Sequence, residues 1–596
     1  MAKTAVAGAK LPEWDLSDLY PGMQAVPLMR DLQRAAQLCE RFRKHYEGKV
    51  ESLPGQTLAE AVAAYETLQD LLGRIGSYAQ LCYAKAMTDP ETGRFYQNMQ
   101  EQLTDLSTQT LFFTLAINKI SDEAMAEKLL SPPLRKYAPW LRDVRAFKPY
   151  QLADDLEKIL HEKVVAGRAA WIRLFDETVA SLRFPIGNKK LTEPQALDLL
   201  SSREAATRRK TALIIGKVME EHAPLFALIT NTLAKDKDIE DRWRGFKQPV
   251  SSRNVSNYIE DKVVETLMAT VQRNYPRLSH RYYGVKARWF GKKQLEYWDR
   301  NAPLPQDRDR KYSWKEAQEL VLTAYRNFSP QLADLGTEFF KKGWIDAPVR
   351  PGKAPGAFAH PTVPSAHPYL LLNYQGKTRD VMTLAHELGH GVHQVLSAKQ
   401  GALMCDTPLT LAETASVFGE QLTFREMLRR EQNPRRRKIM IAAKVEDMLN
   451  TVVRQVAFCE FEKRVHAERK QGELTASRIC DIWMGVQGES FGNSIRIHGN
   501  YRYFWTYIPH FIHTPFYVYA YAFGDCLVNS LYAVYEQESA RGRGKAFEQK
   551  YLAMLEAGGT LRHKELLAPF GLDASKPDFW QQGLNVIAGF IDELES

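Results

Sequence analysis

The sequence predicts a mostly α-helical fold with one small β region, and three observations support that prediction. Apolar residues recur every three or four positions through long stretches of the 596-residue chain, most clearly in residues 58–87. Proline and glycine gather between residues 344 and 377, where a short apolar run at 369–374 is typical of a β-strand. Helix-start patterns recur, each pairing a Ser or Thr with an acidic or amide residue three positions later: Thr88 with Glu91, Thr192 with Gln195, and Ser313 with Glu316.

The order of these elements gives the predicted domain organisation. The stretch WDLSDLYPG, residues 14–22, indicates an ordered segment that ends in a turn before the first helices. Residues 184–195 combine Pro, Gly and Asn, so we expect a helical N-terminal lobe (1–190) and a second domain (191–596). The Gly-rich part of the β region lacks the GxxxxGK[ST] spacing of a phosphate-binding loop. Helical patterns resume at Lys377 and continue through the rest of the sequence.

The composition is typical of a soluble globular protein, with 44% hydrophobic and 25% charged residues. No apolar run is long enough to span a bilayer, and residues 1–10 lack the apolar core of a secretory signal. The six cysteines are scattered without a CxxC pair, which argues against a disulfide framework and against a cysteine metal site. We therefore expect a cytoplasmic protein without a membrane partner.

The net charge of +9 could indicate a nucleic-acid partner, but the charge is dispersed and no nucleic-acid motif accompanies it. The densest basic cluster, residues 429–438, lies beside a proline between helical stretches. We interpret it as a solvated turn, with contact to an anionic partner or substrate as the alternative. No nucleic-acid partner is predicted.

The segment LAHELGHGVH, residues 384–393, contains the pattern His-Glu-x-x-His at His386, Glu387 and His390. Four helical residues advance by about 400°, so both imidazoles lie on one helix face and can bind one metal ion. Glu387 projects beside them, where it can take a proton from a water molecule on that ion. Gly389 and Gly391 each cost roughly 1 kcal/mol against alanine inside a helix, so we expect another backbone or a substrate to approach there.

A catalytic zinc ion usually has three protein ligands and an open position for water, so the motif needs a third ligand. Two common spacings are excluded, because their positions carry Leu396 and Thr410. The first glutamate after the motif is Glu413, 23 residues beyond His390 and on what we expect to be the next helix. We predict Glu413 as the third ligand, with Asp406 as the alternative.

Further predictions concern the surroundings of these ligands. Glu420 lies two turns beyond Glu413 and is expected to support a ligand from behind. As a fourth ligand, His393 would close the water position, so we expect it in the wall of the site. We predict one Zn²⁺ per chain, although Co²⁺ or Mn²⁺ would suit the same nitrogen and oxygen atoms.

Residues 503–524 form an aromatic segment with His510, His513 and five tyrosines. Most of these rings are expected in the core, where buried hydroxyls need hydrogen-bond partners. A His or Tyr in this segment could instead donate a hydrogen bond to the oxyanion of peptide hydrolysis, which is worth roughly 3–4 kcal/mol. The spacing alone does not choose among them.

The chain resembles oligoendopeptidase F, a branch of the thimet-oligopeptidase family of zinc metallopeptidases. The resemblance runs from residue 14 to residue 524 and rests on the segments WDLSDLYPG, GKAPGAFA, LLLNYQGKTRDVMTLAHELGHGVH, ETAS and IPHFIHTPFYVYAYAFG. It implies two helical lobes around a deep substrate channel, with a small β-sheet beside the active-site helix. Residues 191–596 would then be the catalytic zinc metallopeptidase domain.

The resemblance also implies roles for individual residues. Zinc would be bound by His386, His390 and Glu413, with Glu387 as general base and later proton donor. His510 is the first candidate for stabilising the oxyanion. Tyr517 is the second candidate, and Tyr519 or Tyr521 follow. The residues expected to bind substrate come from the Gly-rich loop and the aromatic segment: Gly356, Ala357, Tyr519 and Tyr521.

Two features depart from the usual pattern of that family. Ile512 and His513 follow IPHF at a position that is often aromatic, so we assign no role to His513. The segment between GKAPGAFA and the predicted strand is longer than usual and carries Pro361, Pro364 and Pro368.

The reaction expected from the resemblance is hydrolysis of internal bonds in short unstructured oligopeptides. The extended substrate would pair its backbone with residues 369–374 or 356–359. The alternative enzyme is a metallocarboxypeptidase or dipeptidyl carboxypeptidase, in which Arg496, Arg502 or Lys377 would receive a terminal carboxylate. The non-enzyme alternative is a basic helical binding protein with a structural metal, which would normally need four protein ligands.

Overall fold

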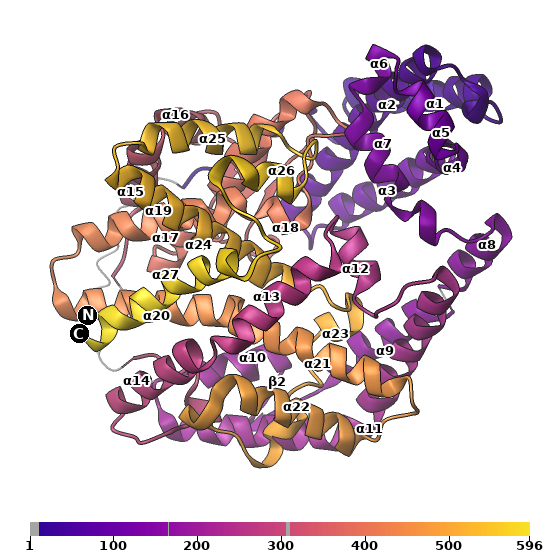
Figure 1. The fold of residues 1–596 in the computed structure, drawn as a ribbon. Coiled ribbons are helices and arrows are strands. Elements are labelled where there is room, and N and C mark those ends of the chain that lie inside the picture. Colours follow the sequence, from indigo (N-terminus) through magenta and orange to yellow (C-terminus); the bar gives the residue numbers. More distant parts are fainter. Residues whose placement is uncertain (1–10, 165, 305–309) are drawn as a thin grey trace. The chain divides into compact units, whose positions relative to one another are not determined.

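The computed structural model describes residues 11–164, 166–304 and 310–596, and helices dominate it (Figure 1). The predicted mostly α fold is therefore confirmed. Residues 1–10, for which no secretory signal is expected, lie outside the described residues. Within the described part of the chain, no helix is both long enough and apolar enough to cross a membrane.

The chain divides into two compact units, each built from three separate segments. Unit 1 consists of the described parts of Met1–Lys148, Asp309–Arg430 and Val534–Gly571. Unit 2 consists of the described parts of Pro149–Arg308, Glu431–Ala533 and Leu572–Ser596. The lobe boundary near residue 190 falls within unit 2 and stays a prediction.

The first helices of unit 1 enclose an aromatic core. The rings of Phe42 and Phe113 lie 5.1 Å apart between centroids, and Trp140 stacks on Phe113. These helices are drawn in indigo and purple in Figure 1: α1 (Val26–Tyr46), α2 (Gly55–Lys85), α3 (Pro90–Thr108), α4 (Leu111–Lys119), α5 (Asp122–Lys128), α6 (Pro132–Arg135) and α7 (Ala138–Val144), with the 3₁₀ turn η1 (Val50–Ser52). The 3₁₀ turn η2 (Arg145–Tyr150) begins in unit 1 and ends in unit 2.

Of the three predicted helix starts, two are confirmed and one is displaced. Thr192 and Ser313 form capping boxes with Gln195 and Glu316. At the first site the N-cap is Asp89, whose carboxylate accepts a hydrogen bond from the Thr92 N–H at 2.9 Å. The prediction of Thr88 was wrong because α3 begins one residue later, at a proline that suits the first helical position.

The rest of unit 1 carries the helix that begins after Lys377, as predicted. Its helices pack around an aromatic cluster in which the ring of Tyr551 lies 4.5 Å from that of Phe418 and 5.4 Å from that of Phe328. The elements are α15 (Trp314–Phe328), α16 (Pro330–Lys341), α17 (Thr378–Ser397), η6 (Ala398–Gln400), α18 (Leu409–Ala412), α19 (Thr414–Arg430), α25 (Gly544–Glu556), α26 (His563–Leu567) and η9 (Ala568–Phe570).

A three-stranded sheet lies directly before α17, where the sequence predicts the β region. Its order is β4 (Ile345–Asp346), β6 (Tyr369–Leu371) and β5 (Phe358–His360), with β6 parallel to β4 and antiparallel to β5. The N-terminal segment packs onto this sheet, because the Trp14 ring contacts the ring of Tyr369 edge-on at 6.0 Å. Residues 14–22 therefore form the ordered segment that the sequence indicates.

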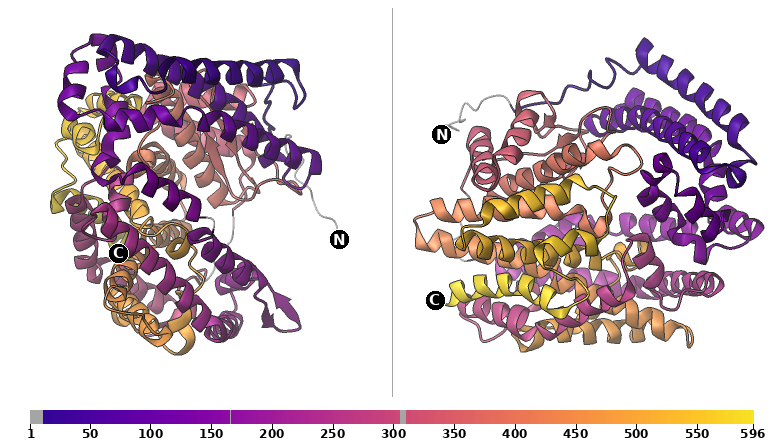
Figure 2. Two further views of the ribbon diagram at one scale, coloured as in Figure 1. Left: turned by 90° about the vertical axis from the view of Figure 1, so that its right-hand side faces the viewer. Right: turned by 45° about the horizontal axis from the view of Figure 1, so that its top comes forward.

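Unit 2 contains the remaining helices and two small sheets. The antiparallel hairpin β1–β2 is the pair of purple arrows in the left view of Figure 2, and β3 pairs with β7 in parallel. The strands are β1 (Phe184–Ile186), β2 (Lys189–Leu191), β3 (Leu295–Glu296) and β7 (Ile495–Arg496). The helices are α8 (Asp154–Lys163), α9 (Arg168–Ser181), α10 (Glu193–Asp198), η3 (Leu199–Ser201), α11 (Ala205–Arg244), α12 (Ser251–Ser256), α13 (Asp261–Arg273), η4 (Pro276–His280), α14 (Arg281–Trp289), η5 (Tyr297–Asp299), α20 (Pro434–Thr451), α21 (Val453–Arg469), α22 (Ala476–Phe491), η7 (Gly492–Ser494), η8 (Gly499–Tyr503), α23 (His510–His513) and α27 (Pro577–Glu595), while α24 (Tyr519–Ala540) begins in unit 2 and ends in unit 1.

Candidate metal centre

Two neighbouring helical segments of unit 1 bring three side chains to one point. His386 and His390 lie one turn apart on α17, and Glu413 lies at the junction between α18 and α19. The Nε2 atoms of the two histidines are 3.2 Å apart, and each lies 3.4 Å from Oε2 of Glu413. Among the described residues, Asp406 is not part of this group.

These distances fit a tetrahedral metal ion. Ligand atoms that lie about 2.0–2.1 Å from zinc in tetrahedral geometry are about 3.3–3.4 Å from one another. The three separations of 3.2, 3.4 and 3.4 Å therefore match three corners of such a tetrahedron, with the fourth corner left for water or substrate. Two imidazole nitrogens and one carboxylate oxygen also form a common donor set of catalytic zinc.

Polar neighbours orient two of the three side chains. Nδ1 of His386 lies 2.7 Å from Oε1 of Glu420. In that arrangement Nδ1–H donates to the carboxylate, and Nε2 keeps its lone pair for a metal. Ser416 Oγ donates to Oε2 of Glu413 at 2.6 Å. Glu420 thus lies where the sequence places it, behind a histidine.

The pKa values show that this point favours positive charge. Burial acts to lower the pKa of His386, but the hydrogen bond to Glu420 and the charges of Glu413 and Glu387 outweigh burial and raise the pKa to about 9. Burial acts to raise the pKa of Glu413, but its hydrogen bond to His390 and the charge of that ring lower the pKa to about 2. Carboxylates surround two imidazoles here, which is the electrostatic setting of a cation site.

Gly389 allows α17 and α19 to approach closely, and Gly391 leaves room for a side chain of α16. A Cβ atom on Gly389 would lie 2.5 Å from the carbonyl oxygen of Ala415, and one on Gly391 would lie 2.7 Å from the ring of Phe339. Neither distance leaves room for a side chain. The predicted approach of another backbone is confirmed at Gly389, where it brings the start of α19 next to the histidines, whereas Gly391 is approached by side chains.

Two buried tyrosines hold this junction, and sequence reasoning missed both. Tyr325 donates a hydrogen bond to the carbonyl of Ala385 at 2.7 Å, and Tyr551 donates one to the carbonyl of Thr414 at 2.9 Å. Each acceptor is the direct chain neighbour of a predicted metal ligand. The partners are separated by 60 and 137 residues, so no local pattern in the sequence could indicate either contact.

Glu387 lies beside the ligands in a buried position, with 7% of the residue exposed. Burial raises its pKa, and the nearby rings of His386 and His390 act in the opposite direction. A raised pKa makes a carboxylate a better proton acceptor, which suits a general base.

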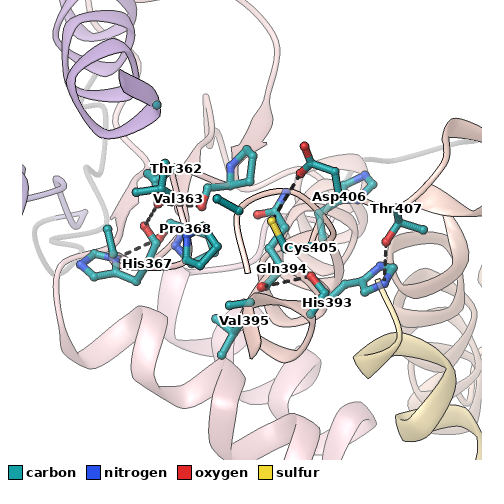
Figure 3. Close-up of a pocket in the computed structure, with 18 of the residues that line it drawn as sticks. Thr362, Val363, His367, Pro368, His393, Gln394, Val395, Cys405, Asp406 and Thr407 are labelled. Carbon is teal, nitrogen blue, oxygen red and sulfur yellow. Dashed lines mark hydrogen bonds between the residues drawn. The ribbon is translucent and has the colours of Figure 1, made fainter. Parts of the chain in front are cut away.

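A cavity of about 740 Å³ within unit 1 reaches His390. Figure 3 shows part of its lining, including His393 and Thr407. The Pro-rich segment 361–368 forms part of its wall, so the feature that departs from the usual family pattern lies beside the candidate metal centre.

His393 also lines the cavity, with Nε2 3.2 Å from Thr407 Oγ1. Burial lowers the pKa of His393 to about 4. His393 is therefore a neutral wall residue, as the sequence predicts.

The Gly-rich loop leads into an open edge of the sheet. Gly356 adopts a positive φ of 79°, and Ala357 directly precedes β5. Within the described residues, β5 pairs on one side only, whereas β6 pairs on both. The expected strand pairing of a substrate with residues 369–371 is therefore wrong, because the backbone groups of β6 are already used. The other edge of β5 pairs with no strand among these residues, and Gln394 Nε2 donates a long hydrogen bond of 3.5 Å to the Ala359 carbonyl of this strand.

Three of the aromatic residues predicted to be functional form a cluster in unit 2. His510 Nε2 lies 3.4 Å from the hydroxyl of Tyr521, and the ring of Tyr517 lies 5.2 Å from that of Tyr521. The ring of Tyr519 instead points into the core, and its hydroxyl accepts a hydrogen bond from Asn257 Nδ2 at 2.8 Å. We therefore remove Tyr519 from the residues expected to touch substrate, because its burial gives it a packing role.

A buried glutamate holds the turn between α23 and α24. Phe516 has a positive φ of 61°, which is unfavourable for a bulky side chain. Its N–H donates a hydrogen bond to Oε1 of Glu462 at 2.8 Å. Arg253 donates to the neighbouring carbonyl of Pro515 at 3.3 Å. His513 Nε2 lies 2.7 Å from Oδ1 of Asp176.

Comparisons with known families give a consistent result. The sequence profile of peptidase family M3 matches residues 198–586, and the profile described as oligopeptidase F matches residues 117–184. The chain is 24% identical to oligopeptidase PepF of Bacillus subtilis, over 98% of this chain and 86% of that protein. It is 26% identical to an oligoendopeptidase F homolog of Borreliella burgdorferi, over 98% of each.

Solved structures support the same fold. A crystal structure from Chlamydophila abortus, of a protein assigned provisionally as a peptidase, matches with a TM-score of 0.86 at 23% identity, covering 98% of this chain and 97% of that one. Oligoendopeptidase-F from Enterococcus faecium matches with a TM-score of 0.71 at 20% identity, covering 96% and 98%.

Proposed function

The chain belongs to peptidase family M3 and is a metallopeptidase, and from that premise we propose that it is a zinc endopeptidase acting on short unstructured peptides. The observation that carries this proposal is the triangle of ligand atoms, 3.2, 3.4 and 3.4 Å apart, on His386, His390 and Glu413. When bound, zinc supplies a Lewis acid that polarises the scissile carbonyl and acidifies a water molecule.

The side chains around the zinc site have distinct tasks in this proposal. Glu387 takes a proton from the attacking water and later delivers it to the leaving amine. Glu420 fixes the ring of His386 through Nδ1, so that Nε2 faces the metal. His510 and Tyr517 are the proposed donors to the oxyanion, and such a donor contributes roughly 3–4 kcal/mol to transition-state stabilisation.

The substrate is proposed to add as a strand to the free edge of β5. Backbone hydrogen bonds would supply affinity there without reading side chains, so the cleavage preference should be broad. Gly356 and Ala357 would line the approach, because they directly precede this strand. All six cysteines are free thiols, which supports a reducing compartment such as the cytoplasm.

The carboxypeptidase alternative finds less support. A terminal carboxylate needs an available cation, but Arg496 is paired with Glu296, and Arg502 is paired with Asp481 at 2.9 Å. Lys377 is exposed at the start of α17 and is the remaining candidate of the three.

The test uses a quenched fluorescent peptide of about ten residues. Hydrolysis should stop when the metal is stripped with a chelator and return when one equivalent of Zn²⁺ is restored. Mass spectrometry of the products then separates internal cuts from stepwise trimming at the C-terminus. Activity that persists without metal would overturn the zinc mechanism, and purely stepwise trimming would replace the endopeptidase by the carboxypeptidase.

A further inference from the structure

A second cavity, of about 170 Å³, lies within unit 2 and is lined by two arginines. Arg300 follows η5, and Arg454 lies in the first turn of α21. Neither guanidinium forms a salt bridge with any carboxylate among the described residues. The one side-chain acceptor bonded to Arg300 is neutral, since its Nε donates to Oδ1 of Asn301 at 3.2 Å.

The carboxylate of Glu446 already accepts hydrogen bonds from other side chains. Glu446 acts on Arg300 electrostatically. Its Oε1, however, receives a hydrogen bond from Lys286 Nζ at 2.6 Å and another from the Tyr282 hydroxyl at 2.7 Å. Burial, followed by repulsion from Arg300, lowers the pKa of Arg454 to about 10. Two half-buried like charges therefore line this cavity, and the carboxylate that acts on Arg300 is already bonded to Lys286 and Tyr282.

Unsatisfied donors belong to the same lining. Arg454 Nε, Gln487 Nε2 and the Tyr297 hydroxyl are all buried without a hydrogen-bond partner within the described residues. The amide oxygen of Gln487 already accepts a hydrogen bond from the Tyr501 hydroxyl at 3.0 Å, so the amide nitrogen is the end left over. Buried polar groups nearly always find partners, and these three atoms can all donate.

We propose that this cavity binds a small inorganic anion, a halide or a tetrahedral oxyanion, between Arg300 and Arg454. The anion places one or two negative charges between the two guanidinium groups and accepts hydrogen bonds from Gln487 and Tyr297. A cation would be repelled, and water alone would bring no negative charge to the two arginines. The site requires no peptide and no metal, so it stands independently of the peptidase reaction.

The experiment measures thermal unfolding of the full chain in its metal-loaded form at constant ionic strength. Lactobionate, a disaccharide acid too large for the cavity, is replaced stepwise by chloride or by inorganic phosphate. The expected result is a saturable rise in melting temperature of roughly 2 °C at 100 mM anion for a dissociation constant near 1 mM. The anion with the lower half-saturating concentration identifies the site as one for halides or for oxyanions.

Variants distinguish this site from a general salt effect. Arg454→Gln should abolish the saturable response, and Arg478→Gln should keep it, because Arg478 is paired with Glu468 and does not line the cavity. Tyr297→Phe retains the ring and should raise the half-saturating concentration of the anion about tenfold. This variant still tests the site if Arg454→Gln fails to fold. Equal melting temperatures in chloride, phosphate and lactobionate would overturn the proposal. The proposal would also be overturned if the melting temperatures of Arg478→Gln, Arg454→Gln and Tyr297→Phe rose equally with anion concentration.

Discussion

Glu462 gives the sharpest prediction about pH, because the fold buries its carboxyl group almost completely. The residue is 2% exposed, and its Oε2 has no hydrogen-bond partner among the described residues. Burial raises its pKa from 4.5 to about 8, although the Phe516 N–H and the charges of Arg253 and Lys237 act in the opposite direction. The perturbation is Glu462→Gln, which keeps the size and the acceptor for Phe516 but removes the titration.

The expected magnitude follows from the two pKa values. Below pH 4.5 the carboxyl is protonated in both the folded and the unfolded chain, so its contribution to stability is fully present. Between pH 4.5 and about 8 the unfolded chain releases the proton while the folded chain keeps it, so stability falls as the pH rises. At about 1.4 kcal/mol for each pH unit, Glu462 should cost the native protein about 4 kcal/mol between pH 5 and pH 9.

The assay is urea unfolding of both proteins at pH 5 and pH 9. The native protein should lose about 4 kcal/mol more than Glu462→Gln over this interval. Glu473→Gln is the matched control, because Glu473 is exposed just beyond the same helix, and it should follow the native protein. If Glu462→Gln and the native protein showed the same pH dependence, the carboxyl would be ionised in the fold and the reasoning would be refuted.

Three further predictions concern the metal centre. Glu387→Gln should keep its metal, measured by elemental analysis, and lose about 10²–10⁴-fold in kcat; unchanged turnover would remove Glu387 from the mechanism. Glu413→Ala should lose metal while Asp406→Ala keeps it, and the opposite pattern of metal content would exchange their roles. Gly389→Ala should lower the free energy of unfolding by about 1–3 kcal/mol and weaken metal binding, because its Cβ would lie 2.5 Å from the Ala415 carbonyl oxygen. Denaturation and metal titration curves like those of the native protein would contradict that packing argument.

Local sequence patterns predicted much of the fold and the two histidines of the candidate metal centre. The spacing of His386 and His390 depends only on helix geometry, so the sequence was enough to place them on one face. The glycines at 389 and 391 indicated a close approach because glycine is unfavourable in helices without such a reason. The capping box at Ser313 is likewise a contact between residues three positions apart.

Features that depend on distant contacts escaped prediction. The position of β6 in the middle of its sheet is set by β4, which lies about 25 residues earlier and pairs in parallel with it. The separation of Tyr519 from Tyr517 and Tyr521 depends on Asn257, which is 262 residues away in sequence. The hydroxyls of Tyr325 and Tyr551 also escaped prediction, because each donates a hydrogen bond to a carbonyl group that is distant in sequence.

The interleaved chain path has a consequence for biosynthesis. The hydroxyl that holds the carbonyl beside Glu413 belongs to Tyr551, which leaves the ribosome 137 residues after Thr414. At about 5–20 residues per second, translation delays that contact by roughly 7–27 s. A growing polypeptide therefore acquires this contact beside Glu413 only near the end of its synthesis.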